Sequence, residues 1–293
     1  MKVVIGIPAF NEEKNIGGII SSIQELDYSV IVCNDGSSVQ TGKIAEKMGA
    51  IVVNHQKNMG YGAAIKSLFL KAKEIDSDIL VTFDGDGQHN ISEIKDVISP
   101  LVSKETDIVI GSRFFGEGEE KIPKYRKLGI KAITKISSIS QDLDIKDTQS
   151  GFRGYNKKAL VEINPTENGM GISTEILIKA AKKNLRVKEV PIIINYEGNT
   201  STHNPASHGL SVILSTMKFT SLEHPLKFYG IPGIAFLIVG LFFIVWTLHE
   251  FSIHRMIFTN LALIAAGTTI IGTVFLLTSI ILYSMVSLIR EQK

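Results

Sequence analysis

The chain has 293 residues, 44% of them hydrophobic, and a formal net charge of +2. The small net charge excludes a general electrostatic attraction for nucleic acid. The single cysteine, Cys33, excludes an internal disulfide. The length exceeds that of a typical domain, and the hydrophobic content indicates a membrane part beside a globular one.

Short runs rich in β-branched residues predict five strands in the first part of the chain. Between them, apolar residues recur at helical spacing, as at Ile16, Ile19, Ile20 and Ile23. Alternating strands and helices predict an α/β fold, a mostly parallel sheet with helices on both faces. The predicted strands are residues 3–8, 30–33, 51–53, 79–83 and 108–110.

Polar segments follow four of these strands: PAFNEE the first, NDGSS the second, DGDGQH the fourth and GSRFF the fifth. Any one of them could be a turn, because Asn, Asp, Gly and Ser favour turns. Parallel sheets bind ligands at the carboxyl ends of their strands. Because four polar segments occur at the same ends of the strands, a binding site is favoured over four unrelated turns.

The segment NMGYGAA, residues 58–64, has the spacing of two glycines found in dinucleotide-binding loops. Ile65 stands where a third small residue is needed, so the pattern G-x-G-x-x-G/A is absent. A Gly-rich turn that opens a helix is the simpler interpretation. Its backbone N–H groups could still hold a phosphate.

Two aspartates, Asp84 and Asp86, stand one residue apart where the fourth strand ends. Carboxylates at this spacing suit a hard divalent cation, which prefers oxygen ligands and keeps coordination positions for phosphate. Gln88 adds a neutral oxygen. We expect His89 to lie behind these ligands or at the surface, because an all-oxygen site suits Mg²⁺ better. An Asp/Gly turn without a metal is the alternative.

The composition changes abruptly near residue 226. Two runs without a charged residue follow, 228–248 and 256–289. Each exceeds the roughly 20 residues that a helix needs to cross a bilayer. We therefore expect a cytosolic domain over residues 1–225 and two transmembrane helices over residues 226–293.

Basic residues flank the outer ends of this predicted helix pair. Lys218 and Lys227 precede the first run, and Arg290 and Lys293 follow the second, whereas the connection HEFSIHR contains Arg255 as its one basic residue besides histidine. Positive charge marks the cytoplasmic side of membrane helices. The predicted location is the cell membrane, with two spans and the large domain on the cytoplasmic face.

Five motifs followed by two apolar runs carry a family resemblance. They are PAFNEE, NDGS, DGDGQH, GSRF and DTQSGFR. Together they resemble the GT-A-fold family 2 glycosyltransferases, and more closely the polyprenyl-phosphate sugar synthases, which include the dolichyl-phosphate mannose and glucose synthases. The resemblance extends from residue 3 to about residue 196. It implies a nucleotide-sugar donor and dolichyl or polyprenyl phosphate as the acceptor.

The resemblance also implies roles on the donor side. Mg²⁺ or Mn²⁺ would be held by Asp84, Asp86 and Gln88 and would bridge the nucleotide diphosphate. Phe10 stands where the family often has a tyrosine, so a hydroxyl contact is lost there. Residues that match nucleotide-sugar contacts are Pro8, Ala9, Asn11 and Glu12 in the first loop, Asp35 at the base or ribose, and Asp84.

On the acceptor side, Arg113 in GSRF matches a basic residue that faces the acceptor phosphate. Arg126 and Lys131 lie in a stretch that often carries arginines for the same purpose. Lys131 departs from that pattern, because lysine offers a point charge rather than a bidentate fork. Ordinary surface charge is the alternative for all three residues.

Residues 198–209, GNTSTHNPASHG, lack an arginine that the mannose synthases carry after their last strand. The segment is similar to one in archaeal dolichyl-phosphate hexosyltransferases of protein N-glycosylation, which use UDP-sugars. A UDP-hexose or UDP-GlcNAc donor is therefore favoured over GDP-mannose. His203 and His208 could contact diphosphate or sugar, or be loop residues.

The expected chemistry is a single displacement with inversion. A polyprenyl phosphate is already anionic, so it needs no strong base to attack the anomeric carbon. The catalytic candidates are Asp86, Arg113 and Asp147, with Asp86 or Asp147 as the base if one is needed. Two basic amphipathic stretches, residues 122–139 and 210–222, are typical of helices at a membrane surface, although they could instead pack on the sheet.

Two other functions fit the same motifs. One is a family 2 enzyme that extends a lipid-linked oligosaccharide or another cell-surface glycan by attack of a sugar hydroxyl. The other is a non-catalytic, membrane-anchored sugar-nucleotide binder, which the intact DxDxQ motif disfavours. The sequence leaves open whether the chain forms a homo-oligomer.

Overall fold

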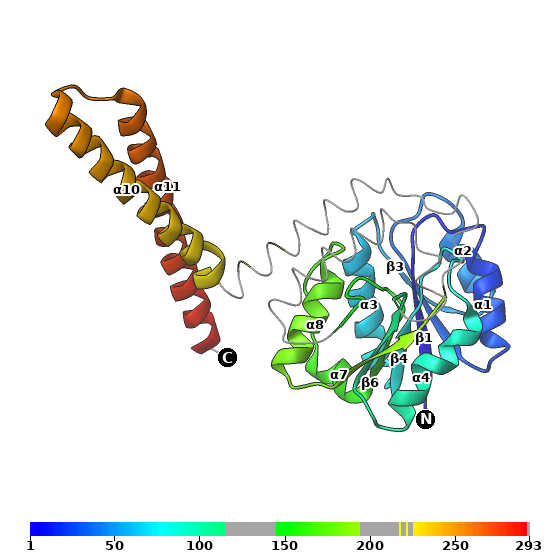
Figure 1. Cartoon of the computed structure of the whole chain (residues 1–293). Coiled ribbons are helices and arrows are strands. Elements are labelled where there is room, and N and C mark those ends of the chain that lie inside the picture. The colour runs from blue at the N-terminus through cyan, green and yellow to red at the C-terminus, as the bar shows by residue number, and fades with distance from the viewer. Residues whose placement is uncertain (115–144, 194–216, 218–220, 222–224, 292–293) are drawn as a thin grey trace. The chain divides into compact units, whose positions relative to one another are not determined.

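The computed structural model describes residues 1–114, 145–193, 217, 221 and 225–291 (Figure 1). The chain divides into two compact units, Met1–Thr216 and Met217–Lys293. The predicted surface stretch 122–139 lies outside the described residues, and so does the stretch 210–222 except for residues 217 and 221.

The first unit is built on a seven-stranded sheet with the strand order β3-β2-β1-β4-β6-β5-β7. All five predicted strands are present. β6 pairs antiparallel with β4 and β5, and the other pairs are parallel. The strands are β1 (Val3–Ala9), β2 (Ser29–Asn34), β3 (Ile51–Asn54), β4 (Ile79–Thr82), β5 (Ile108–Ser112), β6 (Arg153–Asn156) and β7 (Val187–Pro191).

Helices cover both faces of this sheet, as predicted (Figure 1). Successive strand residues point to opposite faces, so Ile5 of β1 packs with one set of helices and Val4 with the other. One face holds α1 (Ile16–Gln24), α2 (Thr41–Lys47) and α4 (Ile94–Val102), with the 3₁₀ turn Ile91–Glu93 before α4. The other holds α3 (Tyr61–Glu74), α7 (Lys157–Glu162) and α8 (Ile172–Lys182).

The predicted apolar stripe of α1 is buried in full. Its four isoleucines, Ile16, Ile19, Ile20 and Ile23, are at most 6% exposed. Burial of one such side chain contributes roughly 1.5–3 kcal/mol to folding. The helix is thereby fixed on the sheet, and the loop that precedes it is fixed at the end of β1.

The antiparallel strand β6 brings a further segment to the functional edge of the sheet. Arg153, its first residue, lies opposite Thr82, the last residue of β4. Thr82 Oγ1 also donates to the carbonyl oxygen of Gly151 at 2.7 Å. The motif DTQSGFR, which ends at Arg153, is therefore placed beside the segment DGDGQH that follows β4.

The second unit contains two long apolar helices packed as a pair, α10 (Ile231–His254) and α11 (Thr259–Glu291), preceded by one π-helical turn, Leu226–Gly230. Both are long and apolar enough to cross a membrane. Glycines lie at the contact: a Cβ on Gly233 would come within 3.1 Å of Leu276, and one on Gly272 within 2.9 Å of Leu237. Small residues permit such close approach of membrane helices.

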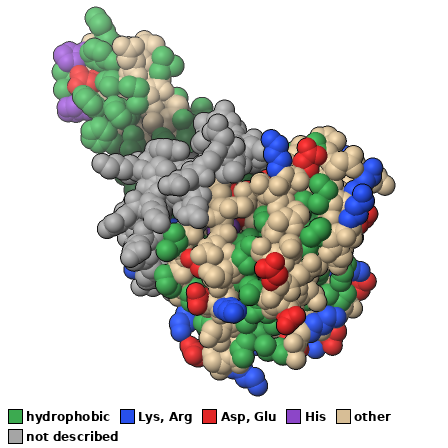
Figure 2. Space-filling view, turned by 90° about the vertical axis from the view of Figure 1, so that its right-hand side faces the viewer, with side chains coloured by type: hydrophobic (Ala, Val, Ile, Leu, Met, Phe, Trp, Pro, Cys, Tyr) green, Lys and Arg blue, Asp and Glu red, His purple; other side chains and the backbone are tan. Residues whose placement is uncertain are grey.

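The surfaces of the two units differ in kind. On the face of the α/β unit seen in Figure 2, Lys and Arg side chains are interspersed with Asp and Glu side chains. Large hydrophobic side chains of the helix pair, by contrast, are exposed along both helices, from Ile231 to Leu288. This distribution suggests membrane anchoring through the helix pair.

Candidate functional site

The loops that follow β1 and β2 are hydrogen-bonded to each other at the carboxyl ends of these strands, where a binding site was predicted. Asn11 Oδ1 accepts from the backbone N–H of Ser38 at 2.9 Å, and the N–H of Asn11 donates to Ser37 Oγ at 3.0 Å. Asn11 has a φ of 60°, a left-handed conformation that asparagine tolerates. At the end of β1, after Pro8, the carbonyl of Ala9 accepts from the N–H of Asp35 at 2.9 Å.

The segment that follows β4 packs against the first of these loops. Asn15 Nδ2 donates to Glu12 Oε2 at 3.1 Å and lies 3.4 Å from the carbonyl oxygen of Asp86. A Cβ on Gly85 would lie 3.2 Å from Ile7. Burial raises the pKa of Glu12 and the charge of Asp86 raises it further, against the Asn15 hydrogen bond. The two acidic segments are therefore close enough for their charges to interact.

Asp35, predicted to contact the base or ribose, is a buried anchor for the loop before α3. Its Oδ1 accepts from the N–H of Met59 at 2.9 Å, and its Oδ2 accepts from the N–H of Gly60 at 2.8 Å. His55 Nδ1 lies 2.6 Å from Oδ1. The contact of Asp35 with a nucleotide stays a prediction.

The glycines of NMGYGAA have a structural cause. A Cβ on Gly60, whose φ is 99°, would lie 2.5 Å from the carbonyl oxygen of Asn168, and one on Gly62 would overlap that of Glu167. The N–H of Gly60 donates to Asp35, and that of Ala63 donates to the carbonyl of Asn168 at 3.2 Å. These two N–H groups are thus engaged within the protein, and the close approach of residues 167–169 accounts for the glycines.

Asp84 lies at the centre of the site with its side chain 29% exposed. Its Oδ2 lies 3.2 Å from His89 Nε2 and its Oδ1 lies 3.4 Å from the hydroxyl of Tyr61. A Cβ on Gly151 would lie 2.7 and 2.8 Å from these two oxygens, so the glycine of DTQSGFR makes room for the carboxylate. Burial opposes its charge, but the hydrogen bond with His89 and the charges of His89 and Arg113 outweigh it and lower the pKa of Asp84.

Asp86 is the second carboxylate at this point, and its Oδ1 accepts from the N–H of Gln88 at 3.0 Å. Burial and the charge of Asp84 raise the pKa of Asp86. Within the described part of the chain, Asp86 forms no ion pair with Lys or Arg. Two interacting carboxylates that are not both neutralised suit a hard divalent cation, and the side chain of Gln88 stays the predicted third ligand.

His89 is buried rather than exposed, and it lies behind the predicted metal ligands. Its side chain is 4% exposed and packs between Phe83 and Phe152, with ring centroids 5.6 and 5.1 Å away. Over the described ranges, no cluster of three or more His, Cys, Asp or Glu side chains has the arrangement of a metal site. Asp84, Asp86 and Gln88 stay the predicted ligands, and His89 contacts Asp84 from the buried side.

Arg113 and Asp147 form a two-point ion pair. Arg113 Nε donates to Oδ2 and Nη2 donates to Oδ1, each at 2.6 Å, and the N–H of Arg113 donates to Oδ2 at 3.2 Å. Asp147 is fully buried. Burial opposes its charge, but Arg113 outweighs this and lowers the pKa of Asp147. The two residues, 34 positions apart in the sequence, are thus held together, and the charge of Arg113 reaches Asp84.

Arg153 organises the segment that carries Asp147 and Gly151, although no role was predicted for it. Its side chain is buried and donates to the carbonyl oxygens of Thr148, Ser150 and Ser173 at 2.7–2.9 Å. An arginine inside the apolar context GFRGY is a signal that could have identified it, because a buried guanidinium requires several acceptors.

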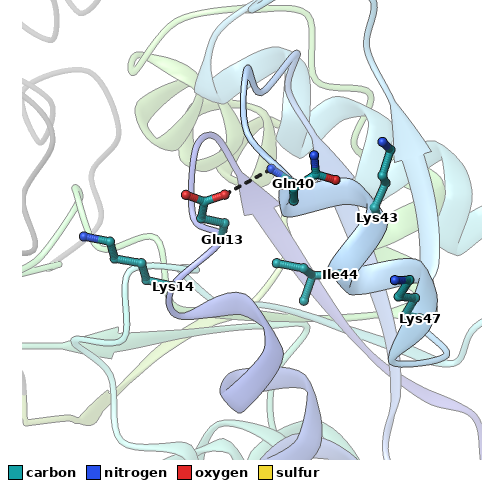
Figure 3. A pocket seen from close by; sticks show the side chains of 6 residues that line it. All are labelled: Glu13, Lys14, Gln40, Lys43, Ile44 and Lys47. Carbon is teal, nitrogen blue, oxygen red and sulfur yellow. Dashed lines mark hydrogen bonds between the residues drawn. The ribbon is translucent and has the colours of Figure 1, made fainter.

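The remaining predicted site residues, Arg126, Lys131, His203 and His208, lie outside the described residues. A cavity of about 470 Å³ opens beside the joined loops, between the residues before α1 and helix α2 (Figure 3). Across it, the backbone N–H of Gln40 donates to Glu13 Oε2 at 3.2 Å. Of the predicted donor, acceptor and metal residues that the structure describes, none lines the cavity. Its lining consists of Glu13, Lys14, Gln40, Lys43, Ile44 and Lys47.

Comparison with known proteins identifies the family. The model of the family "Glycosyl transferase family 2" matches residues 4–163. A UDP-N-acetylglucosamine–dolichyl-phosphate N-acetylglucosaminyltransferase of Methanococcus voltae is 33% identical over 64% of this chain and 82% of its own length. A dolichyl-phosphate hexose transferase of Haloferax volcanii is 31% identical over 78% and 96% of the two chains.

A solved structure shares the fold. It is glucosyl-3-phosphoglycerate synthase from Mycobacterium tuberculosis in complex with Mn²⁺ and UDP-glucose, which matches with a TM-score of 0.59 and 21% identity over 75% of this chain and 78% of that one. The α/β unit therefore has the GT-A-type fold. With the family model covering more than half of its length, this chain belongs to glycosyl transferase family 2.

Proposed function

We propose that the chain transfers a sugar from a nucleotide-sugar to dolichyl or polyprenyl phosphate, which gives a lipid-phosphate sugar for protein glycosylation. A UDP-hexose or UDP-GlcNAc is the favoured donor and GDP-mannose the alternative. The names of the two archaeal relatives support the lipid phosphate as acceptor.

The observation that carries this proposal is the ion pair between Arg113 and Asp147. A sugar hydroxyl would need a carboxylate base, and the two candidates are Asp86 and Asp147. Both oxygens of Asp147 accept from Arg113 and its pKa is lowered, and Asp86 is assigned to the metal. A phosphate acceptor needs no base and instead needs a cation beside the donor. Arg113 supplies that cation, and its charge already acts on Asp84. We therefore assign Asp147 to the positioning of Arg113 rather than to proton transfer.

On the donor side, Mg²⁺ or Mn²⁺ would be held by Asp84, Asp86 and Gln88 and would act as a Lewis acid on the departing diphosphate. The oxygen donor set fits such an ion, and the Mn²⁺ in the related fold supports the choice. The nucleotide would contact the joined loops through Pro8, Ala9, Asn11, Glu12 and Asp35.

On the acceptor side, Arg113 would bind the lipid phosphate by charge-assisted hydrogen bonds. Attack of a phosphate oxygen on the anomeric carbon from the side opposite to the diphosphate would invert the configuration. The helix pair would anchor the enzyme beside its acceptor in the cell membrane. Lys227 and Arg290, at the two outer ends of the pair, favour the cytoplasmic side for the α/β unit.

The decisive experiment is a donor panel. The purified full-length chain is incubated in detergent with dolichyl phosphate, Mg²⁺ or Mn²⁺, and radiolabelled UDP-glucose, UDP-galactose, UDP-GlcNAc or GDP-mannose, with Asp86→Asn as the inactive control. We expect one donor to give a lipid-linked monosaccharide phosphate. Label that enters only a preformed lipid-linked oligosaccharide would contradict the proposal, and nucleotide binding without transfer to either acceptor would indicate a non-catalytic binder.

A further inference from the structure

A buried histidine that no motif contains, His55, lies directly behind the predicted nucleotide site. It follows β3, and its ring contacts three side chains, which come from β2, the loop after β2 and α3. Nδ1 lies 2.6 Å from Asp35 Oδ1, and Nε2 lies 2.8 Å from Ser67 Oγ on α3 and 3.6 Å from Cys33 Sγ on β2. The side chain of His55 is 9% exposed. Its ring is thus held at both nitrogens.

The roles of the two ring nitrogens follow from their partners. An ionised carboxylate can only accept, so Nδ1–H donates to Asp35. In the neutral ring, Nε2 then accepts from the hydroxyl of Ser67. Burial and the charge of Asp35 raise the pKa of the Cys33 thiol to about 12, so Cys33 adds no charge to this cluster.

Asp35 is nearly saturated by the protein. A carboxylate offers about four acceptor positions. His55 and Met59 occupy two on Oδ1, and Gly60 occupies one on Oδ2. Within the described part of the chain, one acceptor position is left, on Oδ2, and the other three bonds set its direction. A ligand group that binds there must be an N–H or O–H donor, as a nucleobase or a ribose hydroxyl provides.

The hydrogen bonds of Asp35 with the loop before α3 also connect it to the predicted metal site. Asp35 fixes the backbone of Met59 and Gly60, and the next residue, Tyr61, places its hydroxyl 3.4 Å from Asp84 Oδ1. Three consecutive residues therefore connect the carboxylate of Asp35, which follows β2, with the carboxylate of Asp84, which follows β4.

We propose that His55 is a positioning residue for nucleotide recognition: it holds Asp35 in the orientation that receives the nucleoside and, through residues 59–61, supports the position of Asp84. The inference rests on the proposed function, because the contact of Asp35 with the donor is part of it. His55 itself touches neither donor nor acceptor.

Two amide substitutions separate the two ring contacts of His55. In His55→Asn the amide nitrogen lies near the position of Nδ1 and can still donate to Asp35. In His55→Gln the amide lies near the position of Nε2, so the contact with Ser67 can be kept while that with Asp35 is lost. The measurements are the Kd of UDP by calorimetry on the full-length chain in detergent with Mn²⁺, and KM and kcat for the donor identified by the panel.

We expect His55→Gln to raise the Kd of UDP and the KM of the donor about tenfold, the effect of one lost hydrogen bond to a charged group. The KM for dolichyl phosphate should change less than twofold. His55→Asn should restore most of the affinity, and the matched substitution His254→Gln in the helix pair should bind UDP as the wild type does.

Failure of this inference is distinguishable from failure of the proposed function. A wild type that binds no nucleotide would remove the function itself. A wild type that binds UDP while both amide variants bind equally well, or equally poorly, would overturn the role of the His55–Asp35 hydrogen bond. If His55→Gln does not fold, Ser67→Ala is measured instead, because it removes the partner of His55 Nε2. A Kd of UDP raised about threefold supports the inference, and an unchanged Kd overturns it.

Discussion

The α/β unit and the helix pair are held together by different kinds of contact. In the α/β unit, buried charged side chains such as Arg153 and Glu175 are held by several directional hydrogen bonds. Arg153 donates to three backbone carbonyls, and the fully buried Glu175 accepts from the N–H groups of Thr166 and Glu167. In the helix pair, the closest contacts involve glycines such as Gly233 and Gly272, and large side chains face outward.

The difference follows from the surroundings that each unit is built for. A buried polar group costs free energy unless it is hydrogen-bonded, so the α/β unit depends on its partner atoms. Membrane helices gain little from hiding apolar surface from lipid and associate through close packing of small residues. The α/β unit should therefore be weakened by removing atoms, and the helix pair by adding them.

The largest effect should come from removing the guanidinium of Arg153. Arg153→Met would leave three buried carbonyls without their donors, at about 1–3 kcal/mol each. We expect a loss of roughly 4 kcal/mol in the unfolding free energy of the α/β unit, measured by urea denaturation followed by circular dichroism. The control is Lys188→Met, because Lys188 pairs with Glu105 and both side chains are at least half exposed. Equal losses in the two variants would contradict the comparison.

The ion pair between Arg113 and Asp147 predicts a pH dependence. The pKa of Asp147 is lowered in the folded state, so the pair stabilises the fold above the ordinary pKa of a carboxyl, and this contribution is lost as pH falls through the folded value. In Arg113→Met, a buried carboxylate would be left unpaired, at a cost of about 3 kcal/mol at pH 7.

The difference in unfolding free energy between wild type and Arg113→Met should therefore be largest at neutral pH and should shrink below about pH 4. Urea unfolding over a pH series measures it. The double variant Arg113→Met/Asp147→Leu removes both charges and should recover most of the loss at pH 7. A difference that stays constant with pH would show that packing, rather than the charge of Asp147, is responsible.

The metal site predicts the next largest effect. Asp86→Asn should lower sugar transfer by about 100-fold, because loss of a charged ligand weakens Lewis-acid stabilisation of the leaving group; this equals about 2.7 kcal/mol. EDTA should stop the wild-type reaction, and Mg²⁺ or Mn²⁺ should restore it. Asp96→Asn, an exposed position on α4, is the control. Full activity in EDTA would remove the metal from the proposal.

The sequence predicts the parts of the fold that periodicity encodes. β-branched runs mark the five strands, the stripe of isoleucines marks α1, and uncharged runs mark the helix pair. Two strands of the sheet, β6 and β7, are not among the five predicted. β6 was missed because RGYN has neither alternation nor β-branched residues. Its position in the sheet depends on pairing with β4 and β5, which no local pattern contains.

In the candidate site, the sequence identifies residues whose type states their chemistry, such as Asp84 and Asp86. It does not identify residues whose role depends on a distant partner. Gly60 is needed because the backbone near Asn168 approaches it. His55 follows a short strand with no motif around it and becomes informative only when Asp35 lies at 2.6 Å. Tertiary contacts across 20 or more positions supply this information.

The smallest effect is expected in the helix pair, where one matched substitution tests packing directly. A Cβ on Gly240 would overlap Thr269 Oγ1, whereas one on Gly267 would meet nothing within 4 Å. Replacing glycine with leucine raises helix propensity equally at both positions, so the difference between the variants isolates the contact between α10 and α11. Gly240→Leu should lower the free energy of association of the two helices by about 2 kcal/mol through overpacking, and Gly267→Leu should leave it unchanged.

Trp246, the one tryptophan of the chain, lies on α10 and reports separation of the helices during SDS titration in mixed micelles. UDP binding should stay unchanged in both variants if the α/β unit is independent of the helix pair. Equal SDS midpoints for the two variants would show that close packing at Gly240 does not hold the pair together.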